Sequence, residues 1–163
     1  KNKDKDILIF MNSSVSTEFN QPILDNYIDY FKDNNDIGLF GISANSKKYQ
    51  SIIPFGFNPH IQSYFFITTS KILEKVIQKN NGSFPGINIT EYNKYRLIID
   101  GEIKLNEIIL ELGYCIAFVD EYGEVNKYSK NKIFKSKYSW VKPTGDQRLK
   151  TNYPSQANFI KKN

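Results

Sequence analysis

Four consecutive polar residues stand at the predicted start of a helix: Thr68, Thr69, Ser70 and Lys71. The N-terminus of a helix presents backbone N–H groups and the positive end of the helix dipole, so hydroxyls and a cation at this position can form an anion site. Lys75, one helical turn further on, would add a second positive charge. A plainer interpretation also fits these residues, in which Ser70 caps the helix and both lysines are solvated.

Three further side chains have the chemistry for a site. Arg96 stands among apolar residues, where it could meet an anionic ligand or lie at a surface. His60 is the one histidine, and its Asn58-Pro59-His60 context predicts a turn residue rather than a proton shuttle. Cys115 is the one cysteine, and its apolar surroundings predict a buried, inert thiol. The sequence has no Cys/His metal spacing, no glycine-rich phosphate loop and no Gly-x-Ser-x-Gly motif.

Two helices are predicted from apolar residues at helical spacing. The first spans residues 20–33, with Asn20 as a possible N-cap and Pro22 in the first turn. The second begins at Ser70 and ends at Asn80-Asn81-Gly82, residues that tolerate a left-handed conformation. A third, short helix is predicted near residues 108–112.

The remaining apolar runs predict strands. Three of them, separated by turn-like residues, predict an antiparallel meander: residues 37–43, 49–57 and 63–69. Strands are also predicted at residues 6–11 and 95–104, and a final hairpin at 114–119 and 125–128. The expected class is therefore α+β.

Three short motifs in this order resemble the pyridoxamine 5′-phosphate oxidase-like family of FMN-binding split barrels. They are Pro54-Phe55-Gly56, then Tyr64-Phe65-Phe66-Ile67-Thr68-Thr69-Ser70-Lys71 with Lys75 and Asn80 following, and Arg96-Leu97-Ile98-Ile99-Asp100-Gly101-Glu102. The resemblance covers about residues 20–120. It implies an antiparallel split β-barrel with two or three flanking helices, a homodimer, and a flavin-dependent oxidoreductase acting on a small-molecule redox substrate.

The resemblance also implies which residues bind FMN. Thr68, Thr69, Ser70 and Lys71 correspond to the phosphate-binding positions, with Lys75 as a second phosphate cation and Pro54 and Arg96 as further contacts. Many members of the family have an arginine immediately before the Pro-Phe-Gly motif, whereas this chain has Ile53. A barrel that has changed or lost its ligand is therefore an alternative.

A second family resemblance leads to a different function. The segment Asp6–Ser16 looks like the first strand and metal loop of a von Willebrand factor A domain. In this interpretation Asn12, Ser14, Ser16 and Asp100 would bind Mg²⁺, giving a metal-dependent interaction domain rather than an enzyme. Asn12 replaces the carboxylate that such a loop normally has.

Charge divides the chain of 163 residues unevenly. Ten basic residues and one acid follow residue 125, a charge of +9, whereas 12 basic and 16 acidic residues give the first 125 a charge of −4. We therefore expect an N-terminal strand and linker (1–19), a split-barrel domain (20–125) and a basic C-terminal tail or extension (126–163). The tail could bind an anionic partner such as nucleic acid, or be solvated.

No apolar run reaches the roughly 18 residues needed to span a membrane, and the first residues do not resemble a signal peptide. These features predict a soluble, cytoplasmic protein with no transmembrane segment. The chain does not begin with Met, which indicates processing and leaves a removed leader open.

Overall fold

The structure is a computed structural model, and it describes residues 6–11, 21–47, 57–63, 65–89, 94–119 and 123–130. A five-stranded sheet has the order β1 (Ile7–Met11), β5 (Phe65–Thr69), β2 (Ile37–Gly41), β6 (Cys115–Val119) and β7 (Val125–Tyr128). Only β2 and β6 run parallel in this sheet. A second sheet consists of β3 (Ala44–Lys47) and β4 (Phe57–Ile61), paired antiparallel.

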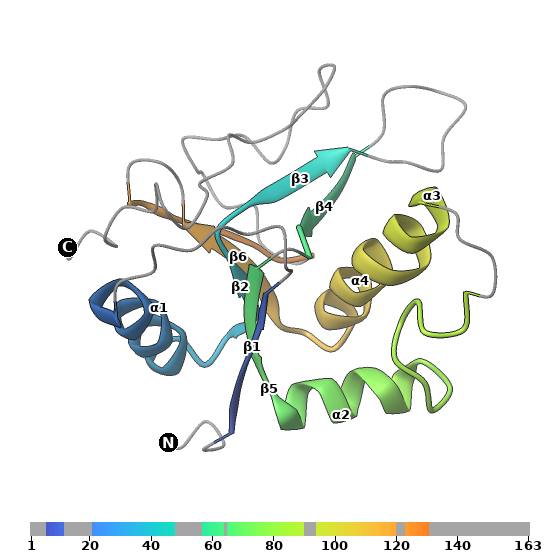
Figure 1. Ribbon diagram of the computed structural model, residues 1–163, viewed down its shortest axis with the longest axis horizontal. Coiled ribbons are helices and arrows are strands. Elements are labelled where there is room, and N and C mark those ends of the chain that lie inside the picture. The colour runs from blue at the N-terminus through green and yellow to red at the C-terminus, as the bar shows by residue number, and fades with distance from the viewer. Residues whose placement is uncertain are drawn as a thin grey trace.

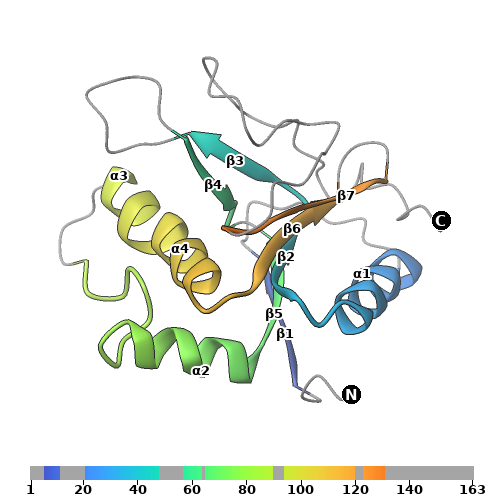
Figure 2. The ribbon, with the colours of Figure 1, turned by 180° about the vertical axis from the view of Figure 1, so that it is seen from behind.

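The helices lie on both faces of the larger sheet. Figures 1 and 2 show α1 (Gln21–Asp33) on one face and α2 (Ser70–Lys79) on the other, together with a long helical segment. This segment consists of α3 (Lys94–Arg96), the π-helix η1 (Leu97–Ile103) and α4 (Lys104–Glu111). The α+β class and the flanking helices are confirmed, whereas the two sheets are open among the described residues and barrel closure stays a prediction.

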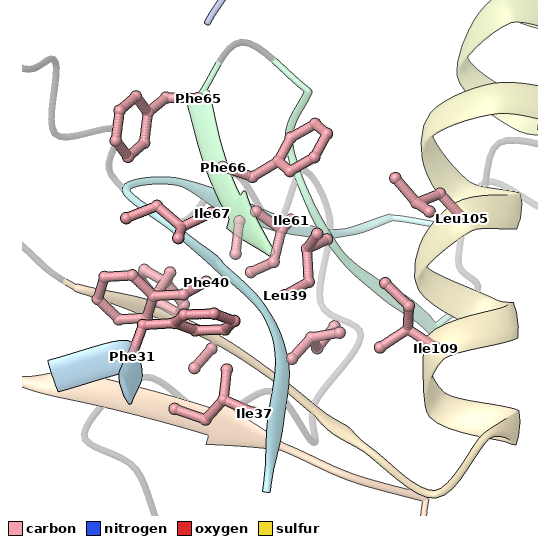
Figure 3. Close-up of a cluster of buried hydrophobic side chains, with 14 of the residues drawn as sticks. Phe31, Ile37, Leu39, Phe40, Ile61, Phe65, Phe66, Ile67, Leu105 and Ile109 are labelled. Atoms are coloured by element: carbon pink, nitrogen blue, oxygen red, sulfur yellow. The ribbon is translucent and has the colours of Figure 1, made fainter. Parts of the chain in front are cut away.

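The core lies between the helices and the central strands. Strands β2, β5 and β6 are buried along their whole length, as expected for a sheet covered on both faces. Tyr27 of α1 makes edge-to-face contacts with Phe40 and Phe65, at centroid distances of 5.8 and 6.3 Å. Figure 3 shows Leu105 and Ile109 pointing from α4 toward the strands.

The predicted strand at residues 95–104 is wrong, because this segment is helical. The run Leu97-Ile98-Ile99 is apolar and contains two β-branched isoleucines, and so short a run cannot be assigned by periodicity alone. Ile103 is buried and continues the apolar face of α4, which buries Ile108 and Ile109. Packing of this face against the sheet outweighs the local β preference.

The predicted turn at Asn58-Pro59-His60 is also wrong, because these residues belong to β4. Proline is tolerated at an edge strand or a bulge, and both conditions hold here. Among the described residues β4 pairs with β3 alone, and their register shifts between Asn45 and Lys47.

The meander is modified rather than simply confirmed. β2 and β5, the first and third predicted runs, pair directly with each other, and β3 and β4 continue the pair as a separate ribbon. Most of the second predicted run, residues 49–57, lies outside the described residues. The predicted strand at 6–11 and the final hairpin are confirmed as β1 and as β6 with β7.

Both predicted domain boundaries separate segments that the structure joins in one sheet. The N-terminal strand β1 pairs with β5 along five residues, so it belongs to the main sheet. The limit between residues 125 and 126 falls inside β7. Lys127 and Lys130, counted with the basic tail, form ion pairs with Asp36 and Glu111. The rest of the predicted tail, from residue 131, lies outside the described residues.

Candidate functional site

The predicted phosphate-binding residues lie at the junction of β5 and α2, as expected, but two of the hydroxyls already have internal roles. Thr68 is buried, and its Oγ1 donates to the carbonyl oxygen of Gly38 at 2.8 Å. Thr69, rather than Ser70, is the N-cap of α2, and its Oγ1 accepts from the backbone N of Ile72 at 3.2 Å. The single hydroxyl hydrogen of Thr68 is therefore used within the sheet.

The other residues at this junction have separate positions. Ser70 is the first residue of α2, and its backbone N donates to the carbonyl oxygen of Asp6 at 3.3 Å. Lys71 is exposed. Lys75 contacts Tyr114, the residue before β6. Its Nζ donates to the Tyr114 hydroxyl at 2.9 Å and lies 5.3 Å from the centroid of the ring. The lysine and the aromatic ring thus form a cation–π contact.

Arg96 is not brought to this junction. It lies on α3, whereas Figures 1 and 2 show the start of α2 on the far side of the helical layer. Its guanidinium pairs with the Asp100 carboxylate four residues later, at 2.8 Å. Pro54 and Ile53 lie outside the described residues.

The metal loop of the alternative interpretation cannot be assembled from the described residues. Asn12, Ser14 and Ser16 lie outside them, and Asp100 lies on η1 instead of at a strand end. No cluster of three or more His, Cys, Asp or Glu side chains with metal-binding geometry occurs in the part of the chain that the structure describes. Asp100 belongs to the segment predicted as a strand, and this segment is helical.

The structure instead brings together two residues 42 positions apart, His60 and Glu102. His60 lies on β4 and its side chain is 1% exposed, whereas Glu102 lies on η1 and its side chain is 13% exposed. His60 Nε2 is 3.5 Å from Glu102 Oε1. Glu102 Oε2 accepts from the backbone N of Ser63 at 2.6 Å, a short, charge-assisted hydrogen bond. We call His60 and Glu102 the histidine–glutamate pair.

The π-helix determines where Glu102 lies. A π-helix of seven residues, Leu97–Ile103, is unusual, since such turns are rare and frequently occur at functional sites. The loop after α2 lies close against it: a Cβ added to Gly86 would lie 2.9 Å from the Cα of Gly101. Gly86 has a φ of +82°, so glycine is required both by the backbone and by this close approach.

Asn106, on the first turn of α4, joins the two elements. Its Oδ1 accepts from the backbone N of Ile61 at 2.8 Å. Its Nδ2 donates to the carbonyl oxygens of Ile61 and Glu102, at 3.1 and 2.8 Å. The side chain is 1% exposed, and its amide is hydrogen-bonded through both the oxygen and the nitrogen.

The two members of the pair differ in their access to solvent. His60 is covered, so an incoming molecule would meet Glu102 first. A carboxylate can accept a proton from a hydroxyl or from water, and an imidazole behind it can fix its orientation. The separation of 3.5 Å is long for a hydrogen bond.

A second polar cluster, between β7 and the start of β2, has a structural character. Lys127 Nζ donates to Asn34 Oδ1 at 2.7 Å and to both carboxylate oxygens of Asp36, at 3.2 and 3.3 Å. Partial burial alone would raise the pKa of Asp36, but the hydrogen bond and charge of Lys127 outweigh it and lower the pKa. Cys115 is buried, as predicted, and its Sγ donates to Asp36 Oδ2 at 3.6 Å.

Sequence reasoning missed the histidine–glutamate pair for two reasons. The pattern ending in Glu102 predicts a strand, and the residues around His60 predict a turn. The signal for the helix was the apolar spacing that leads from Ile99 through Ile103 into α4. No local pattern could connect positions 60 and 102.

Comparisons with known proteins found no family model, curated protein or solved structure that matches the chain. The function is therefore inferred from the geometry of the site. Among the described residues, no helix combines the length and apolar character needed to cross a membrane.

Proposed function

We propose that the protein is an acid–base enzyme in which Glu102 is the general base. The observation that supports this most strongly is the placement of Glu102 on a π-helix, between a backbone N–H and the one histidine of the chain. The hydrogen bond from Ser63 to Oε2, with His60 Nε2 3.5 Å from Oε1, gives the carboxylate a preferred orientation before any substrate arrives, and such preorganisation favours general-base catalysis.

The proposed step transfers one proton to Glu102. A carboxylate has about four lone-pair positions. One, on Oε2, is used by Ser63, and His60 faces Oε1, so positions remain for an incoming O–H group. The O–H bond of water or a substrate hydroxyl breaks, and its oxygen bonds to a carbonyl carbon or phosphorus. The leaving group departs with its bonding electrons and takes the proton back from Glu102.

His60 is a positioning residue in this proposal, because its burial keeps it from touching the substrate. Its Nε2 lies on the inner side of the carboxylate, 3.5 Å from Oε1, and limits the orientations that the carboxylate can take. Glu102 thereby has a polar group behind it, a backbone donor beside it, and a partly exposed outer surface.

Hydrolysis of chromogenic esters tests the proposal. Para-nitrophenyl acetate and para-nitrophenyl phosphate represent the carbon and phosphorus electrophiles, and release of nitrophenolate is followed by absorbance. We expect one of them to be hydrolysed above the buffer rate, and Glu102→Gln to lower kcat by about 10²- to 10⁴-fold, the usual contribution of a general base.

Glu107→Gln is the matched control. It neutralises a carboxylate on the adjoining helix whose ion pair, to Lys104 at 3.9 Å, lies at a half-exposed position. This variant should retain the wild-type rate. Glutamine at position 102 keeps an acceptor oxygen for Ser63, so Glu102→Gln should unfold near the wild-type temperature. Failure to hydrolyse either ester, or equal rates in wild type and Glu102→Gln, would overturn the proposal.

FMN binding at the β5–α2 junction is a second proposal. It is supported by one observation: β5 ends at Thr69 and α2 begins at Ser70, the positions that the family resemblance assigns to the phosphate, with Lys71 exposed beside them. The test is a visible absorption titration with FMN, comparing wild type with Lys71→Ala. Micromolar binding weakened by the substitution supports a flavoprotein, and an unchanged FMN spectrum rejects it. The homodimer, and an anionic partner for the basic tail, accompany this proposal.

A further inference from the structure

Asn106 makes an unusual connection for a side chain on a helix. Its amide pairs with both backbone groups of Ile61, at 2.8 and 3.1 Å, in the manner of a neighbouring strand. Ile61 directly follows His60 on β4, and in the part of the chain that the structure describes β4 has a strand partner only on the β3 side. The side chain of Asn106 thus supplies the hydrogen bonds that a further strand would supply.

The same amide also holds the other half of the histidine–glutamate pair. The second hydrogen of Nδ2 goes to the carbonyl oxygen of Glu102, at 2.8 Å. One planar group therefore links the residue after His60 to the backbone of Glu102. Because the amide is rigid and 1% exposed, movement of either backbone would break a buried hydrogen bond.

Few side chains could make this connection. The position needs one acceptor and two donors within the reach of a short side chain, and only the asparagine amide combines them. Aspartate offers no donor when ionised, and serine offers one hydroxyl. Leucine would leave the backbone groups of Ile61 buried without hydrogen bonds, which is costly.

We infer that Asn106 is a positioning residue that sets the distance between His60 Nε2 and Glu102 Oε1. The inference rests on the proposed function, since it assigns to Asn106 the task of maintaining the general base in its orientation. A plain fastening of α4 to β4 would need the same hydrogen bonds, so the test must observe the pair itself and not stability alone.

The single histidine makes such a measurement possible. Protein labelled with ¹⁵N only at histidine gives one pair of imidazole nitrogen signals, which report the tautomer and the environment of His60. Glu102→Gln provides the reference spectrum of an imidazole without its carboxylate. We expect Asn106→Ala to move the His60 signals at least half of the way toward this reference.

Asn126→Ala is the matched control for loss of a buried asparagine. Asn126 is 4% exposed, lies on β7, and donates to the carbonyl oxygen of Glu124 at 3.3 Å. Both alanine variants should unfold at lower temperature than wild type, but Asn126→Ala should leave the His60 signals in place. Unmoved signals in Asn106→Ala, or equal movement in both variants, would overturn the inference.

If Asn106→Ala does not fold, Asn106→Ser gives the same test, because it keeps one hydrogen-bonding group. The two proposals fail separately. Lack of ester hydrolysis with shifted His60 signals would remove the enzyme but retain Asn106 as the residue that positions the pair. Hydrolysis that depends on Glu102, with unmoved signals in both position-106 variants, would retain the enzyme and remove this role.

Discussion

Gly86→Ala is expected to disturb the candidate site from outside. Gly86 has a φ of +82°, and a Cβ there would lie 2.9 Å from the Cα of Gly101, the residue before Glu102. A backbone atom cannot rotate away as a side chain can, so either the π-helix or the loop that carries Gly86 must shift. We therefore expect a loss of stability together with a change at Glu102.

The magnitude follows from two separable terms. A left-handed backbone costs a residue with a Cβ about 1–2 kcal/mol. Overpacking costs a further 1–3 kcal/mol or so. Gly82→Ala isolates the first term, because Gly82 has a φ of +80° and a Cβ there would meet nothing within 4 Å. The difference between the two variants is thus about 1–3 kcal/mol, which corresponds to roughly 2–12 °C in the midpoint of unfolding.

The assay combines thermal unfolding with the ¹⁵N signals of His60. Gly86→Ala should unfold well below Gly82→Ala, and only Gly86→Ala should move the imidazole signals. Equal destabilisation of the two variants would refute the reasoning, because it would mean that the contact between Gly86 and Gly101 has no energetic weight.

Three further substitutions test individual contacts. Thr68→Val should destabilise the protein by about 1–3 kcal/mol in urea unfolding, because it leaves the buried Gly38 carbonyl without its 2.8 Å hydrogen bond; unchanged stability would contradict this. Tyr27→Phe should stabilise by about 1 kcal/mol, since the Tyr27 hydroxyl is buried with no hydrogen-bond partner among the described residues; a lower unfolding midpoint would argue otherwise. Lys127→Met should cost up to about 1 kcal/mol at pH 7, because it removes the ion pair with Asp36. Lys127 lowers the pKa of Asp36 in the folded protein, so the pair contributes stability at pH values above the unfolded pKa, and this stability is lost as the pH falls through the folded pKa. A cost that stays constant below about pH 3.9 would exclude this linkage.

The helices α1 and α2 could be predicted from the sequence because their signals are local. Ile23, Tyr27 and Phe31 recur at helical spacing, and all three are buried. The end of α2 follows from Asn81 and Gly82, whose φ values of 55° and 80° are left-handed, as their residue types allow.

The segment from residue 95 to 104 could not be predicted because its local preferences and its packing disagree. Three consecutive apolar residues, Leu97 to Ile99, favour a strand, whereas burial of Ile103 on the face it shares with α4 favours a helix. The outcome depends on which neighbours this segment meets. The placement of His60 in a strand also depends on its neighbours, since an edge position next to a bulge lets the strand contain Pro59.

The sequence by itself determined the α+β class, two helices with their ends, the first strand, the final hairpin and a buried cysteine, because each depends on residues within one or two turns of each other. Only the tertiary structure decided the strand order, the π-helix and the meeting of His60 with Glu102. The physical reason is that one buried amide, Asn106, joins backbone groups 41 residues apart from Ile61 to Glu102, and such a contact leaves no periodic trace in either segment.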